Sequence, residues 1–247
     1  MSCCHLEGVS LLTDPEEIAI ISRARQAGVR DPRRSRAHFE SIFRDYFSEL
    51  YMGGHRVLDI GPGQFDFGVM AKAKGADVVG IDRDPAVLEL GRHKGFDVIE
   101  ADLRNVHSCA LRGPYDGLFC KYSLNAFWFA EDLASLSRHL RVFLDVLATG
   151  GWGWIAPWNG PPKRAELSTV QQENVLAAQA DAFRTAGFDE EHLSSDQAKR
   201  YGVHGAPASR VLFTRGLGSL TGKRGAARDE APQGAVADMG CGVVADL

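Results

Sequence analysis

The chain has 247 residues, of which 45% are hydrophobic and 24% are charged, and its formal net charge at pH 7 is -4. This length allows one α/β domain with a full core and short appendages, and the composition is that of an ordinary globular protein. The slight negative net charge provides no overall electrostatic field that attracts nucleic acid or an anionic membrane. A small-molecule partner is therefore favoured over either, with a local basic groove as the alternative.

Cysteine usage and hydropathy favour the cytoplasm. The five cysteines are odd in number and have no disulfide framework, and the Cys3, Cys4 and His5 group lacks a fourth metal ligand at fixed spacing, so no metal site is predicted. No apolar run reaches the roughly 18 residues of a transmembrane helix, and the N-terminus lacks the apolar segment of a secretory signal. The sequence has no feature that specifies an oligomeric state.

The N-terminal quarter predicts helices. Residues 1–13 have no periodic pattern and are expected to be flexible. Asp14 followed by Pro15 is typical of a helix start, and a second helix is expected from Asp31-Pro32 to Leu50. Residues 14–54 therefore form a helical extension that is a candidate lid.

Strands and helices alternate from residue 55. Short apolar strands are expected at 56–60, 77–82, 96–100, 115–120 and 152–156, with helices at 67–74, 85–94, 133–147 and 170–186. This alternation predicts an α/β fold with a doubly wound, mostly parallel sheet over residues 55–216. A last strand at 209–214 is expected to return antiparallel at the edge of the sheet, and residues 217–247 read as a mostly disordered tail.

A glycine turn follows the first expected strand. Asp59 ends that strand, and Gly61 and Gly63 leave the backbone open to a ligand. About twenty residues later the second strand ends in Asp82, whose two carboxylate oxygens suit the hydroxyls of a ribose. In a doubly wound sheet, these carboxyl ends of the strands form the ligand site.

Two classes of cofactor fit such a turn. A dinucleotide needs a small residue at position 66 and a helix start that accepts a pyrophosphate. Asp66 stands there instead, and together with Asp59 it would repel a pyrophosphate. An uncharged adenosine joined to a cationic group fits better, because Asp59 can bind an ammonium directly or through water.

At this point a family is recognisable. The segment 57–68 resembles the first motif of the class I S-adenosylmethionine (SAM)-dependent methyltransferases, and 79–82 resembles the second. The segment 100–103 resembles the third, 119–122 falls where the fourth strand meets the methionine end of the cofactor, and 147–151 resembles the turn before the fifth strand. Five motifs in order cover roughly residues 55–215.

The resemblance implies a Rossmann-like methyltransferase core that binds SAM. The side chains and turns that it assigns to the cofactor are Asp59, Gly61, Gly63, Phe65, Asp82, Arg83, Asp102, Leu103, Lys121 and Tyr122. Among them, Asp82 is expected to hold the ribose and Asp102 the adenine amino group, with Leu103 on the ring.

The sequence departs from the family pattern at two positions. Phe65 replaces the third glycine and is expected either to narrow the loop or to pack against the cofactor. Ala126 stands where a histidine is common, which removes a frequent base. The motif of amino methyltransferases that act on bases or glutamine, Asn/Asp-Pro-Pro-aromatic, is absent from the sequence.

A few further residues are candidates for binding the methyl acceptor. His38, Tyr122 and Asn159 are candidate catalytic residues, and Trp158 is a candidate for the pocket wall. Trp152 and Trp154 are expected to pack against helices.

The sequence therefore predicts a methyltransferase that acts on an O or N atom of a small or medium-sized metabolite. The alternatives are a non-catalytic SAM-fold binding module and, less favoured by the two acids, a nicotinamide-dependent oxidoreductase.

Overall fold

The structure is a computed structural model, and it describes residues 14–24, 32–103, 111–124, 141–158, 168–185, 187–203 and 210–214. Seven strands form one sheet in the order β3-β2-β1-β4-β5-β7-β6. The strands are β1 (Arg56–Ile60), β2 (Asp77–Asp82), β3 (Asp97–Glu100), β4 (Tyr115–Lys121), β5 (Leu147–Ala156), β6 (Asp189–His192) and β7 (Arg210–Thr214).

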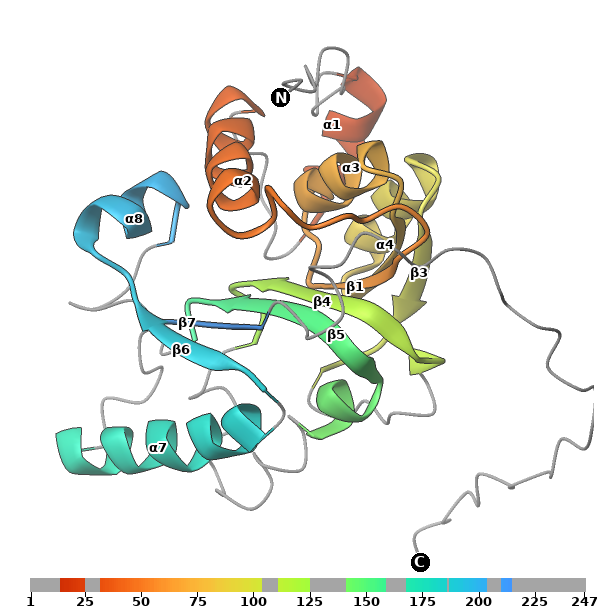
Figure 1. The fold of residues 1–247 in the computed structure, drawn as a ribbon. Coiled ribbons are helices and arrows are strands. Elements are labelled where there is room, and N and C mark those ends of the chain that lie inside the picture. The colour runs from red at the N-terminus through yellow and green to blue at the C-terminus, as the bar shows by residue number, and fades with distance from the viewer. Residues whose placement is uncertain are drawn as a thin grey trace, which may run out of the picture.

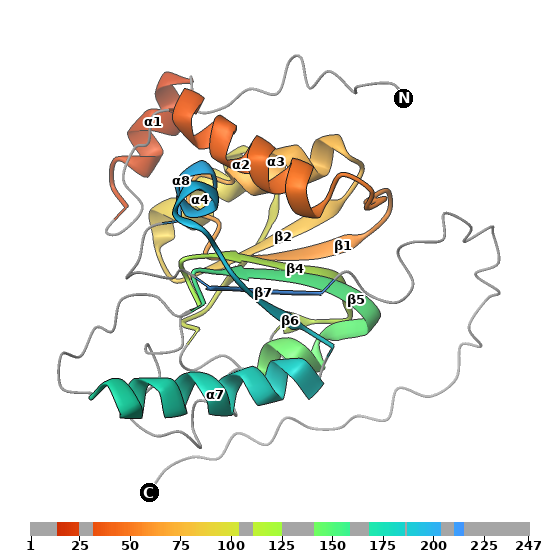
Figure 2. The same cartoon turned by 60° about the vertical axis from the view of Figure 1, so that its left-hand side comes forward.

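Helices flank this sheet on both faces (Figure 1). They are α1 (Pro15–Ile21), α2 (Pro32–Tyr46), α3 (Asp66–Ala73), α4 (Pro85–His93), α7 (Thr169–Thr185) and α8 (Ser195–Arg200). Figure 2 shows α1 to α4 together on one face of the sheet and α7 on the other. The predicted doubly wound α/β class is confirmed.

The strand order places a switch point between β1 and β4. β2 and β4 pair with β1 on opposite sides, and both pairings are parallel. The chain therefore leaves β1 toward one side of the sheet and later returns on the other. Open α/β sheets bind their ligands outside the carboxyl ends of the strands at such a point.

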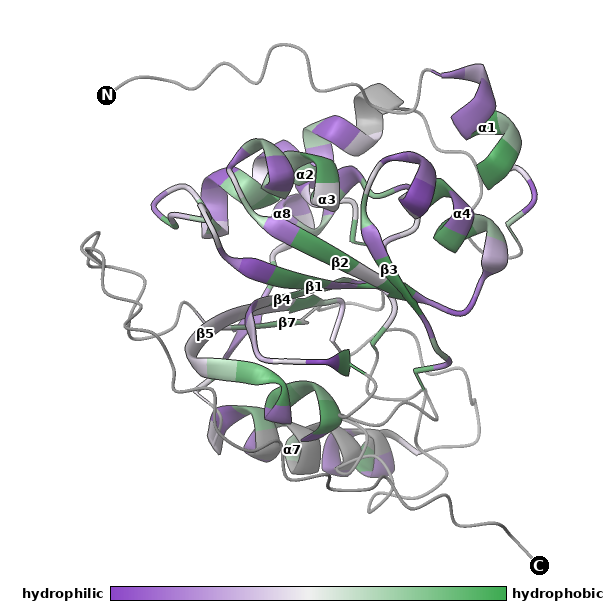
Figure 3. Cartoon of the chain, turned by 90° about the vertical axis from the view of Figure 1, so that its right-hand side faces the viewer, coloured by the Kyte–Doolittle hydropathy of each residue, from purple (hydrophilic) through white to green (hydrophobic). Residues whose placement is uncertain are grey.

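Alternating side chains of the strands divide the core into two clusters. On the face of α1 to α4, Val57 and Phe119 belong to one cluster, whereas Leu58 and Cys120 belong to the cluster on the face of α7. This period of two arises because successive side chains of a strand point to opposite faces. Figure 3 shows the apolar residues concentrated along the central strands, with polar residues on the helices around them.

The expected helix starts are present where the caps predicted them. The Asp14 side chain accepts a hydrogen bond from the Glu16 amide, and Asp84 does the same for Ala86 at the start of α4. Each satisfies one of the backbone donors that a first helical turn leaves unpaired, and a proline follows at the first helical position.

In the C-terminal part of the sheet, the strand order differs from the one that the sequence predicted. β7 lies between β5 and β6 and is antiparallel to both, so the expected edge position was wrong. β6 is the edge strand, and neither it nor α8 was predicted. The helix expected at 133–147 ends earlier, because residues 141–145 are helical and β5 already begins at Leu147.

Among the described residues, no helix is both long enough and apolar enough to cross a membrane. The expected flexible N-terminus and disordered tail lie outside the described residues.

Candidate functional site

The carboxyl end of β1 carries a buried acid. The Asp59 side chain is only 2% exposed, and its Oδ2 atom has no hydrogen-bond partner among the described residues. Burial raises the pKa of this carboxyl well above its usual range, and the negative charges of Asp66 and Asp82 raise it further. A buried acceptor without a donor is rare and points to a missing polar partner.

The turn after β1 brings the chain close to the end of β4. Gly61 adopts a left-handed backbone with φ of 68°, and its amide donates to the Ile81 carbonyl oxygen at 2.9 Å. A Cβ on Gly61 would lie 1.7 Å from the Ser123 hydroxyl oxygen, so only glycine fits here. Gly63 is also left-handed, with φ of 57°. Ser123 was not among the residues that the sequence assigned to the cofactor.

A hydrogen bond from α2 holds the first residue of α3. The Ser35 hydroxyl of α2 donates to Asp66 Oδ2, and both side chains are buried. This bond ties the N-terminal extension to the loop that follows Gly63. Asp66 therefore sits at the glycine turn as the sequence predicted, where it adds a second buried acid beside Asp59.

Phe65 does not line the ligand side of the turn. Its left-handed backbone, with φ of 61°, turns the ring into the core, where the side chain has no exposed surface and stacks on Phe96 with ring centroids 5.0 Å apart. Gly80 and Gly91 make room for the ring, since a Cβ on either would lie within 2.6 Å of it. The predicted contact with the cofactor is therefore corrected to a packing role beneath the turn.

The carboxyl end of β2 presents a carboxylate with one oxygen already bonded. Asp82 Oδ1 accepts from the backbone amides of Arg83 at 2.7 Å and Asp84 at 2.9 Å. Oδ2 accepts no hydrogen bond from a described residue and is left for a ligand. Burial raises the pKa of Asp82 despite these two bonds.

Arg83 and Asp102 lie beside that carboxylate. The Arg83 guanidinium forms an ion pair with Asp102 at 3.2 Å, which ties the end of β2 to the segment after β3. Leu103 is half-buried and packs against the core on the face of α7. The structure thus brings the expected ribose acid and the expected adenine contacts to one rim of the sheet.

The carboxyl end of β4 forms the opposite rim. The Lys121 ammonium lies 4.7 Å from the centre of the Phe39 ring of α2. Tyr122 has a left-handed backbone with φ of 76°, which for a non-glycine residue is a strained conformation found often at ligand sites. Its hydroxyl donates to the Gly202 carbonyl oxygen at 2.7 Å, and its amide donates to the Ala156 carbonyl oxygen at 2.9 Å.

His38 of α2 also packs against Gly202. Gly202 is left-handed with φ of 59°, and a Cβ there would lie 2.2 Å from His38 Nδ1. The structure therefore brings two candidate catalytic residues, His38 and Tyr122, together on Gly202. Asn159 lies outside the described residues.

The aromatic residues of β5 turn away from the site. Trp152 packs on Phe47, which directly follows α2, with ring centroids 4.9 Å apart, and Trp154 packs on Tyr46 of α2 at 5.9 Å, as expected. Trp158 has no exposed surface and contacts Phe183 of α7 at 5.2 Å. Its expected place in the pocket wall is therefore corrected to the core.

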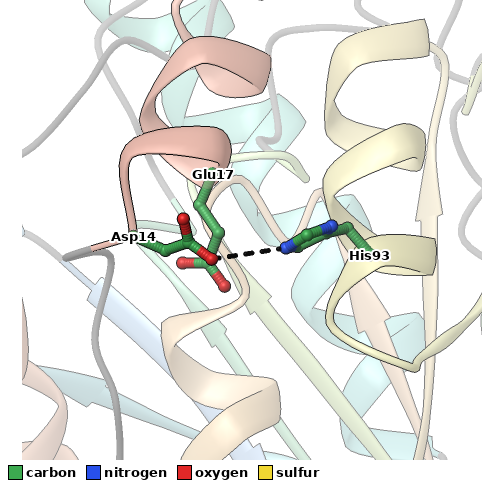
Figure 4. Close-up of side chains that lie close together, drawn as sticks. All are labelled: Asp14, Glu17 and His93. Carbon is green, nitrogen blue, oxygen red and sulfur yellow. Dashed lines mark ion pairs between the residues drawn. The ribbon is translucent and has the colours of Figure 1, made fainter.

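Two further features lie away from the carboxyl ends. A cavity of about 30 Å³ beside Trp152 and Trp154 has room for about one or two waters. Figure 4 shows Asp14 and Glu17 of α1 facing His93 of α4. His93 lies 3.6 Å from Asp14, and Glu17 pairs with Lys94 at 2.7 Å, so these contacts fasten α1 to α4.

Comparisons with known proteins agree with this architecture. No family model matches the chain. Over 113 residues it is 34% identical to the demethylmenaquinone methyltransferase of Thermus thermophilus, a stretch that covers 44% of this chain and 50% of that protein. The chain thus matches about half the length of this relative.

A solved structure shares this fold at low sequence identity. Streptomyces venezuelae DesVI superposes with a TM-score of 0.50 at 13% identity, covering 73% of this chain and 92% of its own. The magnesium protoporphyrin IX methyltransferase ChlM of Synechocystis with bound SAM has a TM-score of 0.48 at 15% identity, covering 74% and 79%. The resemblance to the class I SAM-dependent methyltransferases is confirmed at the level of fold and local sequence.

Proposed function

From the resemblance of this chain to the class I SAM-dependent methyltransferases, we propose that it transfers a methyl group from SAM to an O or N atom of a small or medium-sized metabolite. The observation that carries the proposal is Asp59, a buried carboxylate without a hydrogen-bond donor among the described residues, beside a turn that admits only glycine at position 61. The ammonium of the methionine part of SAM is the kind of donor that this carboxylate lacks.

The residues present fit the rest of SAM as well. Asp82 Oδ2 accepts no hydrogen bond from a described residue and is the proposed acceptor for the ribose hydroxyls. Asp102 and Leu103, on the same rim, are the proposed adenine contacts. The two buried acids at the glycine turn, Asp59 and Asp66, oppose a pyrophosphate.

When bound, SAM supplies a methyl group on a sulfonium, which passes in line to a nucleophile while the sulfur keeps the bonding electron pair. The chain's own part is to hold the acceptor in line with that methyl group and to exclude water. If the acceptor atom must lose a proton, His38, which packs on Gly202 beside the Tyr122 contact, is the proposed base. The Tyr122 hydroxyl already donates to Gly202, which suits a positioning role.

The nicotinamide alternative fits this structure less well. Dinucleotide-binding sheets of this type have the strand order 3-2-1-4-5-6. Here an antiparallel β7 is inserted between β5 and β6. The non-catalytic alternative shares the cofactor site and differs only in lacking turnover.

Differential thermal stabilisation separates these functions. We expect SAM and its demethylated product S-adenosylhomocysteine (SAH) to raise the melting temperature of the chain, and NAD to leave it unchanged. Stabilisation by NAD alone would overturn the proposal. Transfer of radiolabel from SAM to a panel of small alcohols, phenols and amines then distinguishes an enzyme from a binding module.

A further inference from the structure

An open cleft lies between α2 and α8 on the acceptor side of the sheet. Its volume is about 760 Å³, and α8 stands beside α2 in Figure 1. The residues that line it are Ala37, His38 and Ser41 from α2 and Asp196, Lys199 and Arg200 from α8. Because α8 follows the carboxyl end of β6, this cleft opens at the same end of the sheet as the cofactor site.

Only two residues separate the cleft from the β4 rim. His38 lines the cleft and packs on Gly202, and the Gly202 carbonyl accepts the Tyr122 hydroxyl at 2.7 Å. A ligand in the cleft that contacts His38 is thus separated by His38 and Gly202 from the segment expected to hold the methionine end of SAM. This arrangement suits a methyl acceptor.

The charge of the cleft differs in sign from that of the chain. Lys199 is exposed and forms no ion pair with a described residue, and the Arg200 guanidinium is half exposed. Arg200 lies 3.4 Å from Asp45, but Asp45 also pairs with Arg44 at 3.0 Å. Of the residues that line the cleft, Lys199 and Arg200 are cations and Asp196 is an acid, so their formal sum is +1 in a chain whose formal net charge is -4.

Asp45 is itself held in place. It accepts the Tyr201 hydroxyl at 2.7 Å, and these contacts lower its pKa although burial acts in the opposite direction. Arg200 is therefore anchored at one side by a fixed carboxylate, while its remaining N–H groups stay available to a second anion. An anchored guanidinium beside an exposed ammonium is a typical binding arrangement for a carboxylate or phosphate.

We propose that the cleft between α2 and α8 binds the methyl acceptor by an anionic group of that acceptor, a carboxylate or a phosphate, through Lys199 and Arg200. This inference rests on the proposed methyltransferase function and adds the class of substrate to it. The anion is held at the α8 side, and the nucleophilic atom points past His38 toward the β4 rim.

Nuclear magnetic resonance on the full, isotope-labelled chain saturated with SAH tests this directly. Sodium phosphate and sodium acetate are the two anionic probes, and ethylammonium chloride at the same ionic strength is the cationic one. We expect saturable shifts at His38 and at residues 199–202 with one or both anions, and none with ethylammonium. The stronger of the two anions identifies the acceptor's group as phosphate or carboxylate.

Variants at the cleft provide the control. Lys199→Gln should weaken the binding of the tighter-binding anion about two- to fivefold, which is the effect expected from the loss of one exposed charge. Lys199→Glu should abolish saturable binding of that anion. Lys72→Gln on α3, outside the cleft, should bind as the wild type does. Equal binding by Lys199→Glu and wild type, or shifts spread evenly over the basic surface, would overturn the inference.

The two proposals fail separately. If calorimetry shows that SAH does not bind, the methyltransferase proposal falls, whatever the anions do. If SAH binds and neither anion produces saturable shifts in the cleft, the acceptor proposal falls and the methyltransferase proposal stands.

Discussion

Replacing Asp59 by asparagine separates ligand binding from folding. In the chain without cofactor, the carboxyl is buried beside two other acids, and its pKa lies well above the ordinary value of 3.8. An acid whose pKa is higher in the folded than in the unfolded state lowers stability as the pH rises from 3.8 toward the folded pKa. Asp59→Asn removes that titration, so the unliganded variant should be at least as stable as the wild type at neutral pH.

Asp59→Asn should weaken the binding of SAH, although it does not lower the stability of the unliganded chain. A hydrogen bond between charged groups is worth about 1.5–3 kcal/mol net. Its loss corresponds to a rise of about 10- to 150-fold in the dissociation constant of SAH. Because the bound ammonium favours the ionised carboxylate, SAH binding should release a proton below the raised pKa of Asp59, and affinity should rise with pH in that interval.

Calorimetry in two buffers measures both effects. At a pH below the raised pKa of Asp59, wild-type heats of SAH binding should differ between two buffers whose ionisation heats differ, and the heats of Asp59→Asn should not. Asp189→Asn, at an exposed acid at the start of β6, is the control and should behave as the wild type. The reasoning is refuted if Asp59→Asn binds SAH within about twofold of the wild type, a difference well below the energy of one charged hydrogen bond.

Three other substitutions follow from the site. Gly61→Ala should abolish measurable SAH binding and lower the melting temperature, because its Cβ would lie 1.7 Å from the Ser123 oxygen; unchanged SAH affinity would contradict the tight turn. Phe65→Ala should reduce the free energy of unfolding by about 3–5 kcal/mol in chemical denaturation, as for other buried aromatic rings, and a loss under about 1 kcal/mol would speak against its core position. Tyr122→Phe should raise the acceptor KM with SAH affinity retained, because the hydroxyl bond to Gly202 is lost while the ring and backbone are kept. Steady-state kinetics with an acceptor found in the panel would check this, and a weaker affinity for SAH with an unchanged acceptor KM would contradict it.

The central strands were predictable because local and long-range signals agree in them. The bounds of β1 and β2 match the prediction, since each is an apolar run closed by a turn residue. β6 was missed because its sequence, Asp-Glu-Glu-His, has no apolar residue, and an edge strand needs none on its open side. α8 did have a signal: Ser194 and Gln197 form a capping box.

The site was predictable at the strand ends and not beyond them. Asp59 and Asp82 follow from strand and turn positions alone, whereas Phe65 could not be placed, because a left-handed backbone decides which way its ring points. The approach of Gly202 to His38 joins segments far apart in the sequence, and only the packing of α8 on α2 reveals it.

The central claim is that the carboxyl ends of β1 and β2 hold SAM. Calorimetric titration of the wild type and Asp82→Ala with SAH tests it most directly, because Asp82 lies at the ribose position, and the exposed Asp189→Asn serves as the control. We expect the wild type and Asp189→Asn to bind SAH equally, and Asp82→Ala to bind at least about tenfold more weakly, as for the loss of one or two hydrogen bonds. No binding to the wild type, or equal binding to Asp82→Ala, would contradict it.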